Sequence, residues 1–210
     1  MKAYKLTDQN GKTHINTQWG ENVTHEVFAN GEGLCSSSWL HFYTDPLIAI
    51  LLNPAHENIQ NPILWECEAE GEILHEPLKS DCKKLTTLRK IPTPEINSAQ
   101  KIAFAILCAK EIYKDKVWSI WANNWLSGKD RNITYAAFAA SVASVDSAAS
   151  ASAAFAAAAS ATSATSATYA AAFAAFAAIA AFAATYAAAY ADINYKIDFS
   201  SIAKKAMEIQ

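Results

Sequence analysis

One stretch constrains this 210-residue chain more than any other: residues 147–191 contain no Asp, Glu, Lys, Arg or His. Of the 44 alanines in the chain, 32 lie between Thr134 and Ala191. Alanine is the best helix former because it has no side-chain entropy to lose. Two long helices, at about 134–160 and 167–191, are predicted because the large residues recur at spacings of three and four, as on one face of a helix: Tyr135, Phe138, Val142, Val145, Tyr169, Phe173, Phe176, Ile179, Phe182, Tyr186 and Tyr190.

The missing charge bears on how these helices are buried. A helix that faces solvent normally carries a charged face, whereas residues 147–191 offer only Ser, Thr and Ala between the large residues. The helices must then be buried against one another, against the rest of the chain, or against a second copy. We favour a homo-oligomer formed through the alanine-rich helices.

Three other interpretations of the alanine-rich stretch are open. Tyr169–Ala191 is 23 uncharged residues, long enough to cross a membrane, but alanine is only marginally apolar and no Lys or Arg flank precedes it. An ice-binding face would need aligned threonines, and Thr162, Thr165 and Thr168 drift around a helix of 3.6 residues per turn. Disorder is disfavoured because regularly spaced aromatic residues are not typical of disordered segments. We therefore expect a chain without a membrane span.

Composition changes near Pro92-Thr93-Pro94, so we predict two domains, 1–95 and 96–210. The first has mixed charges and all five histidines, and its alternating short runs predict a small antiparallel sheet with one helix. The expected strands are Lys2–Leu6, Lys12–Asn16, Val23–Phe28, Ser38–Thr44, Ile63–Ala69, Glu72–Glu76 and Leu85–Ile91. The expected helix covers Leu47–Leu52, with Asp45 as N-cap and Pro46 as its first residue, and we expect Asn53-Pro54 to end it. The fold class is α+β, with an alanine-rich all-α bundle or array as its second part.

Three further helices are predicted in the second domain. Ser98–Lys114 has an apolar stripe and Ser98 as a cap. Val117–Leu126 carries Trp118, Trp121 and Trp125 on one face, which is typical of a core rather than of a ligand cage. Gly128 fits the position just after that helix. A short last helix, Ile202–Ile209, would be capped by Asp198 or Ser200.

Charge and cysteine usage exclude several classes of function. The net charge of −3 shows no basic excess, so we do not expect a duplex nucleic-acid partner. The four cysteines form no C-x-x-C pair, which favours reduced thiols and disfavours a disulfide framework or a metal site. No apolar leader follows Met1, so we expect a cytoplasmic protein.

Two groups of residues have the types needed for chemistry. Glu66, Glu68, Glu70 and Glu72 alternate along a predicted strand. A solvated sheet face is the favoured interpretation, and a metal or catalytic carboxylate cluster is the alternative. Gly71 could bulge the strand and split the four into two pairs.

His41, Tyr43 and Asp45 surround a predicted strand-to-helix junction, with Cys35 upstream. A Cys–His pair can act as nucleophile and base, but no local signature surrounds Cys35, and a lone histidine on an aromatic strand is usually structural. The other histidines show no zinc-ligand spacing. We therefore assign no catalytic residue, no metal and no cofactor.

The first domain resembles an uncharacterised domain of phage and prophage proteins that is fused to a repetitive tail. The resemblance lies in Lys2–Lys5, Trp39–Leu47 (WLHFYTDPL), Glu68–Ile73 (EAEGEI) and Leu88–Ile91. The second domain is similar to the alanine-rich helical domains of such proteins, and faintly to putative immunity proteins, through Phe104–Ala109 (FAILCA), Trp125–Arg131 (WLSGKDR) and the alanine run. Related tails carry Arg and Glu among the alanines where this chain carries Ser and Thr.

The resemblance implies a phage-encoded accessory protein that inhibits a host anti-phage defence by binding a host protein or sequestering a nucleotide signal. The exposed aromatic residues and loop charges that we expect to make contact are Trp19, His41, Tyr43, Lys129 and Arg131. One alternative is an enzyme of the first domain that acts on a nucleotide, since its strand order faintly resembles an ADP-ribosyltransferase layout. Another is a structural, virion-associated helical protein.

Overall fold

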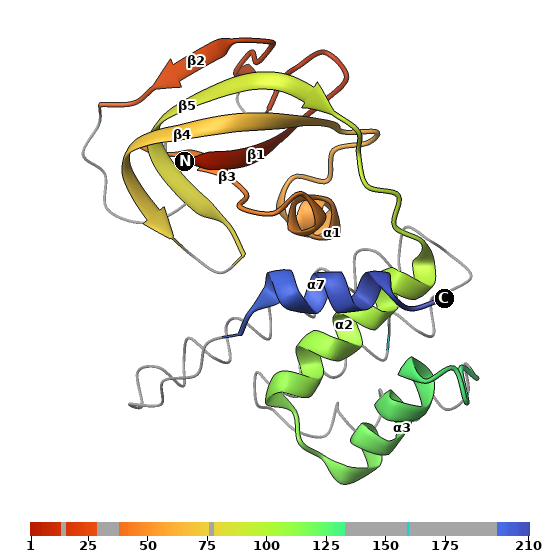
Figure 1. Cartoon of the computed structure of the whole chain (residues 1–210). Coiled ribbons are helices and arrows are strands. Elements are labelled where there is room, and N and C mark those ends of the chain that lie inside the picture. Colours follow the sequence, from red (N-terminus) through yellow and green to blue (C-terminus); the bar gives the residue numbers. More distant parts are fainter. Residues whose placement is uncertain (14–15, 29–37, 76–77, 133–158, 160–196) are drawn as a thin grey trace. The chain divides into compact units, whose positions relative to one another are not determined.

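The computed structural model divides into two compact units, Met1–Glu95 and Ile96–Gln210 (Figure 1). It describes residues 1–13, 16–28, 38–75, 78–132, 159 and 197–210. The two predicted alanine-rich helices and the loop between them lie outside the described residues, apart from Ala159. The same holds for Tyr169–Ala191, the segment considered as a membrane span. The second unit is therefore described below by its other helices.

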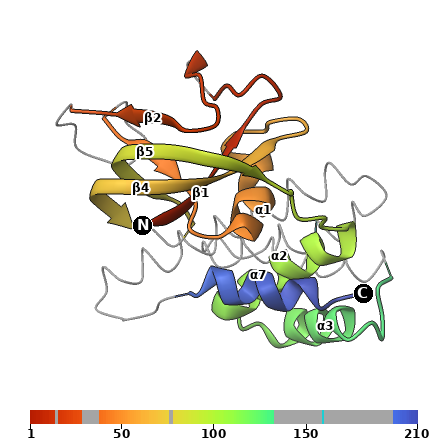
Figure 2. The ribbon, with the colours of Figure 1, turned by 45° about the horizontal axis from the view of Figure 1, so that its top comes forward.

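The first unit is built on an antiparallel sheet of five strands in the described residues. Its central pair is β4 (Ile63–His75) and β5 (Ser80–Ile91). β1 (Lys2–Thr7) pairs with β4, while β2 (Val23–Glu26) and β3 (Leu40–Phe42) both pair with β5 at different places along it. The strands β4 and β5 run side by side and curve strongly (Figures 1 and 2). The antiparallel sheet with one helix confirms the α+β class.

The curvature of β4 arises at Gly71, which has a φ of 78°. The pairing register with β5 shifts between Glu70 and Ile73, so one extra residue of β4 bulges out and bends the strand. Two separate strands, Ile63–Ala69 and Glu72–Glu76, were predicted here. That prediction was wrong, because the chain bulges at Gly71 without leaving the sheet and forms one continuous strand. β5 likewise begins five residues before the predicted Leu85, since its first half pairs with β3.

The predicted strand Lys12–Asn16 does not form in the described residues. Instead the chain makes a turn in which the Asp8 carboxylate accepts hydrogen bonds from the backbone N–H groups of Asn10 and Lys12. Gly11 takes a left-handed φ of 76°, and a Cβ there would lie 2.5 Å from the Trp19 carbonyl oxygen. Only an isolated bridge between Lys12 and Gln18 follows. Side-chain hydrogen bonds of Asp8 thus favour a turn over the expected ladder.

Helix α1 (Pro46–His56) begins as predicted, with the Asp45 side chain accepting from the Leu47 N–H at 2.8 Å and proline in the first turn. The predicted end at Asn53-Pro54 was wrong, because Pro54 lies inside the last turn. The helix ends where Asn58 adopts a left-handed φ of 50°. The Asn53 amide fixes this exit by bonding both backbone groups of Ile59.

The core of the first unit forms on both faces of the curved sheet. One face gathers a buried cluster of Ala3, Trp19, Phe42, Trp65, Cys67, Ala69, Cys82 and Leu85. On helix α1, which contacts β1 (Figure 2), Ile48, Ala49, Leu51 and Leu52 are buried. Burial of large apolar side chains such as these is the main stabilising contribution to a domain of this size.

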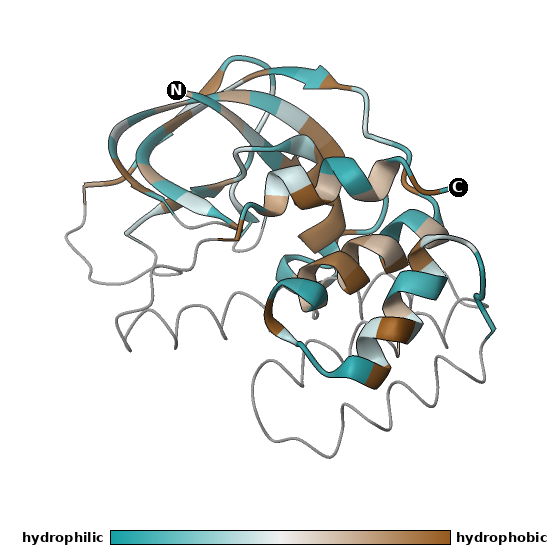
Figure 3. Cartoon of the chain, turned by 60° about the horizontal axis from the view of Figure 1, so that its bottom comes forward, coloured by the Kyte–Doolittle hydropathy of each residue, from teal (hydrophilic) through white to brown (hydrophobic). Residues whose placement is uncertain are grey.

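The second unit contains α2 (Ser98–Ile112), α3 (Lys116–Leu126) and α7 (Phe199–Met207). The N-cap of α2 is Asn97 and not the predicted Ser98, because Asn97 and Gln100 form a reciprocal capping box. Asp198 caps α7, one of the two predicted choices. In Figure 3, hydrophobic residues (brown) and hydrophilic residues (teal) both occur along α2 and α3.

Trp118, Trp121 and Trp125 are all buried, which confirms that the tryptophan face of α3 belongs to the core. α3 ends at Leu126 with Ser127 as its C-cap, and Gly128 follows with a φ of 74°, as predicted for the residue after a helix. α7 packs against α2, where the Gln100 amide donates to the Met207 carbonyl at 2.9 Å. Within the described ranges, no helix combines the length and the apolar character that crossing a bilayer requires.

Candidate functional site

The candidate site of the first unit begins with the pairing of β3 and β5, which places His41 directly opposite Asp81. Residues opposite each other in an antiparallel ladder project to the same face of the sheet. Nδ1 of the His41 ring lies in hydrogen-bond contact with the Asp81 carboxylate. Asp81 is fully buried, whereas the His41 side chain is 27% exposed. A buried carboxylate thus orients an imidazole that is partly exposed.

Asp81 has a second feature that marks the site. Its other oxygen, Oδ2, is buried and has no hydrogen-bond partner among the described residues. A buried carboxylate oxygen without a donor is costly, so the fold retains this acceptor at a cost in stability. A catalytic role or a bound ligand is one physical reason for a fold to keep such a group.

A second imidazole, His56, lies on the last turn of α1, close enough to His41 for the two to interact electrostatically. Nδ1 of His56 is 3.0 Å from the Tyr43 hydroxyl, and the two rings stack at 6.0 Å between their centroids. Burial raises the pKa of Tyr43, and burial together with the nearby charges of Lys79 and His41 lowers the pKa of His56 to about 4. His56 is therefore neutral at pH 7.

Lys5 supports the strand that carries His41. Its ammonium group donates to the His41 carbonyl oxygen at 2.8 Å and lies 4.8 Å from the centroid of the Trp19 ring. Burial lowers the pKa of Lys5. This contact joins β1 to β3 through a backbone oxygen, and it fixes the position of the His41 backbone.

The contact between Asp81 and Nδ1 of His41 matches the carboxylate–imidazole pair that enzymes use to position a general base. In that pair the carboxylate holds the ring in one tautomer and stabilises the charge that forms when the ring takes a proton. The same arrangement serves equally well to present one defined hydrogen-bonding group to a ligand. The geometry thus supports two uses of the site, binding and proton transfer.

The structure corrects part of the predicted contact set. Trp19 and Tyr43 are not exposed: they retain 3% and 5% of their accessible surface. The Trp19 ring packs in the core of the sheet, where its Nε1 bonds Thr13 at 3.2 Å, and the Tyr43 hydroxyl is engaged by His56. Both act as supports for the site and do not form its surface. Of the three residues predicted in the first unit, only His41 offers side-chain surface to a ligand.

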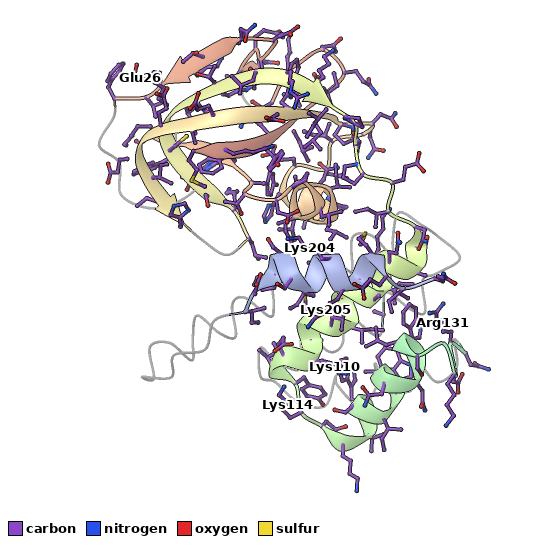
Figure 4. The ribbon with its side chains drawn as sticks, viewed as in Figure 1. Glu26, Lys110, Lys114, Arg131, Lys204 and Lys205 are labelled. Atoms are coloured by element: carbon purple, nitrogen blue, oxygen red, sulfur yellow. The ribbon has the colours of Figure 1, made fainter. Side chains whose placement is uncertain are left out.

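Lys129 and Arg131 belong to the second unit and are exposed. Arg131 stacks its guanidinium 4.7 Å from the centroid of the Trp125 ring and donates to the carbonyls of Trp125 and Gln210. Figure 4 shows Arg131 just beyond the end of α3. These bonds tie the loop after α3 to the C-terminus, so Arg131 has a structural role there.

The row of glutamates forms a solvated face with basic neighbours. Glu66 pairs with Arg89 at 2.9 Å and Lys2 at 3.5 Å, and Glu70 pairs with Lys84 at 2.7 Å. The bulge at Gly71 interrupts the row, as expected. Among the described residues, no group of three or more His, Cys, Asp or Glu is placed to hold a metal ion.

The cysteines in the described residues do not supply a nucleophile. Cys67, Cys82 and Cys108 are free and buried. Burial raises the pKa of Cys67 to about 12 and that of Cys82 to about 11, so both remain thiols at neutral pH. Cys35, the nucleophile considered from the sequence, lies outside the described residues.

Sequence reasoning found His41 but missed Asp81, His56 and Lys5. Asp81 is 40 residues away from His41, and no local spacing links them. The residues around Asp81 (78–84, LKSDCKK) are mostly polar, so no local signal in the sequence indicates that this carboxylate is buried. His56 showed no signal, because the helix was expected to end before it.

Comparison of the chain with known protein families, with curated proteins and with solved structures finds no match. The geometry of the site and the resemblance in the sequence are therefore the two grounds on which a function can be inferred.

Proposed function

We propose that the chain is a phage or prophage accessory protein that inhibits an anti-phage defence of its host by binding a nucleotide-type signal. The observation that carries the proposal is the partly exposed imidazole of His41, fixed by the buried Asp81. The resemblance of both parts of the chain to phage and prophage proteins supports the proposal that the protein is encoded by a phage or prophage. A fixed imidazole offers one defined hydrogen-bonding group to a phosphate-bearing ligand.

The exposure of the site favours a small ligand over a host protein. A stable protein interface buries about 800 Å² on each partner and usually centres on aromatic anchors. The two aromatic residues predicted to serve in that way, Trp19 and Tyr43, are buried. A small ligand needs only a few placed polar groups. Binding to a host protein remains a distinguishable outcome of the experiment below.

The experiment compares the full chain with His41→Ala and with the matched control His75→Gln. His75 is exposed at the end of β4 and lies outside the His41–Asp81 pair. We expect calorimetry to detect binding of a phosphorylated nucleotide by the native protein and by the control. Loss of one hydrogen bond to a charged ligand, about 1.5–3 kcal/mol, should weaken binding by His41→Ala about tenfold or more.

Phage plaquing gives the biological test. Hosts that carry nucleotide-signalling defences should be plaqued better when the native protein or His75→Gln is expressed, and not when His41→Ala is expressed. A protein that protects phage without binding any nucleotide would point to a host-protein partner. An absence of effect on every defence tested would refute the proposal.

An enzyme of the first unit that acts on a nucleotide is the second candidate. The observation that favours it is the carboxylate–imidazole pair, which is the arrangement of a general base. Chromatography of the nucleotide after incubation distinguishes the two: a product that disappears with both His41→Ala and Asp81→Asn supports the enzyme. Recovery of the intact nucleotide supports binding alone.

The proposal places the protein in the host cytosol as a homo-oligomer held by its alanine-rich helices. The uncharged residues 147–191 support oligomerisation, because exposed helices normally carry charge. Native mass spectrometry should give a mass that is a multiple of 22.7 kDa. A single-chain mass, or copurification with phage particles, would instead favour burial within one chain or a virion-associated protein.

A further inference from the structure

The curved sheet of the first unit closes one of its edges and leaves another open. On the β1 side, Tyr4 and Tyr43 exchange both backbone hydrogen bonds at 2.8 Å, so the chain at β3 bridges β1 and β5. On the other side the sheet ends at β2, which has only β5 as a neighbour among the described strands (Figures 1 and 2). An open edge presents unpaired backbone groups to which another strand can bind.

The pairing with β5 decides which backbone groups of β2 remain unpaired. The Val27 N–H group, directly after the strand, donates to the Lys83 carbonyl at 2.9 Å. Because the residues that bond to the neighbour alternate along an antiparallel ladder, Thr24 and Glu26 direct their N–H and C=O groups away from β5. Within the described part of the chain, these four backbone groups have no hydrogen-bond partner.

The side chains next to this edge are exposed. Thr24, Glu26 and Phe28 alternate along the chain, so they project to the same face of an extended segment, and all three are exposed. Phe28 retains 82% of its accessible surface, more than any other large hydrophobic residue that the structure describes. A strand added beside β2 would pair the free backbone groups and also cover part of this side chain.

The charge at the edge indicates which kind of strand fits. Glu26 lies opposite Lys84 of β5, but Lys84 is paired with Glu70 at 2.7 Å. Among the described residues no ion pair engages the Glu26 carboxylate, which lies at the end of β2 (Figure 4). Residues 1–95 contain 8 Lys or Arg and 13 Asp or Glu, a net charge of −5. A basic strand therefore complements both the edge and the unit that carries it.

We propose that the outer edge of β2 binds an extended, basic segment of a partner protein, which adds to the sheet as a further antiparallel strand. The segment exchanges backbone hydrogen bonds with Thr24 and Glu26, and it places a Lys or Arg side chain opposite Glu26. A second copy of this chain fits less well, because self-pairing centred on Glu26 would place two like charges opposite each other. The surface is separate from the His41 site and does not depend on nucleotide binding.

The first test blocks the edge without breaking the sheet. Thr24→Pro removes an N–H group that does not bond to β5, and proline is tolerated on an edge strand when its nitrogen faces solvent. It also removes the 2.8 Å hydroxyl contact between Thr24 and Thr86. The matched control Thr24→Val loses the same contact but keeps the N–H group. We expect Thr24→Pro to bind the segment at least tenfold more weakly than Thr24→Val.

The probe is an eight-residue peptide of alternating lysine and valine with blocked ends, measured by calorimetry on the full chain. In an antiparallel ladder, directly opposite residues share a face, so the lysines that lie opposite Thr24 and Glu26 also supply the bonding amides. N-methylation of the lysine amides should therefore weaken binding at least tenfold, whereas N-methylation of the valine amides should leave it unchanged. A glutamate–valine peptide should bind weakly to the native protein and better than the lysine peptide to Glu26→Lys.

Amide hydrogen exchange locates the peptide. The amides of Thr24 and Glu26 should exchange rapidly in the free protein and slow at least tenfold when the lysine peptide is bound. Equal binding by Thr24→Pro and Thr24→Val, an unchanged peptide preference in Glu26→Lys, or no binding at millimolar peptide overturns the proposal. If Thr24→Pro does not fold, the two N-methylated peptides and Glu26→Lys decide.

Protection of the Thr24 and Glu26 amides that rises with protein concentration in the absence of peptide would assign the edge to a second copy, and it would overturn the proposed partner. Nucleotide binding at His41 should be the same in Thr24→Pro, Thr24→Val and the native protein. Failure of the edge therefore leaves the proposed function standing, and failure of nucleotide binding leaves the edge standing.

Discussion

Acidification between pH 6.5 and 4 should destabilise the first unit through His56. Its pKa is about 4 in the folded state against 6.5 for an ordinary histidine, and burial is the first cause, followed by the charges of Lys79 and His41. A lowered folded-state pKa means that the unfolded chain binds the proton first. Stability is therefore complete above pH 6.5 and declines as the pH falls toward 4.

The size of the effect follows from the pKa difference. Each pKa unit corresponds to about 1.4 kcal/mol, so the full difference is about 3 kcal/mol. His56 is only partly buried, and water screens it, so we expect about 1–2 kcal/mol to be lost by pH 4.5. The groups that surround the ring are Tyr43, His41, Lys79 and Glu57.

The measurement is urea unfolding of the native protein and of His56→Leu at pH 7.5 and 4.5, followed through amide signals of the Met1–Glu95 unit. The leucine variant lacks the titrating ring, so it should lose about 1–2 kcal/mol less than the native protein over this range. His75→Gln should behave like the native protein. A His56 pKa at or above 6.5 by NMR titration, or identical pH dependence of the native and leucine proteins, would refute the reasoning.

Two further perturbations test the fold around the site. Gly11→Ala should cost more than about 2 kcal/mol, because a left-handed φ of 76° combines with a Cβ 2.5 Å from a carbonyl oxygen. Gly128→Ala, with a φ of 74° but no atom within 3.9 Å, should cost only about 1 kcal/mol, and equal losses in urea unfolding would contradict the steric argument. Trp65→Phe removes the 2.9 Å bond from the indole to the buried Thr7 hydroxyl and should cost about 1–3 kcal/mol; a stability change below about 0.5 kcal/mol would show that this bond contributes little.

Much of the local structure was predictable because it depends on short-range chemistry. Asp45 and Pro46 begin α1 as an N-cap and a first-turn proline whatever the helix packs against. The three tryptophans of α3 are buried because their spacing places them on one face. Gly128 follows α3 because a left-handed φ costs glycine little.

The errors arose where side-chain hydrogen bonds or burial in the folded chain decide the outcome. α1 continues through Pro54 because the Asn53 amide and the left-handed Asn58 set its end. Trp19 looked like a loop aromatic residue, yet the curved sheet encloses it. In each case a contact made by the folded chain overrode the local preference.

The sequence by itself determined the α+β class of the first unit, the N-cap of its helix and the buried tryptophan face of α3, because propensity, capping and periodicity act within a few residues. Only the tertiary structure brought Asp81 to His41 and His56 to Tyr43, across 40 and 13 residues. The reason is that strand register and helix packing are set by burial over the whole unit. The hydrogen-bonding state of the candidate site follows from those long-range contacts.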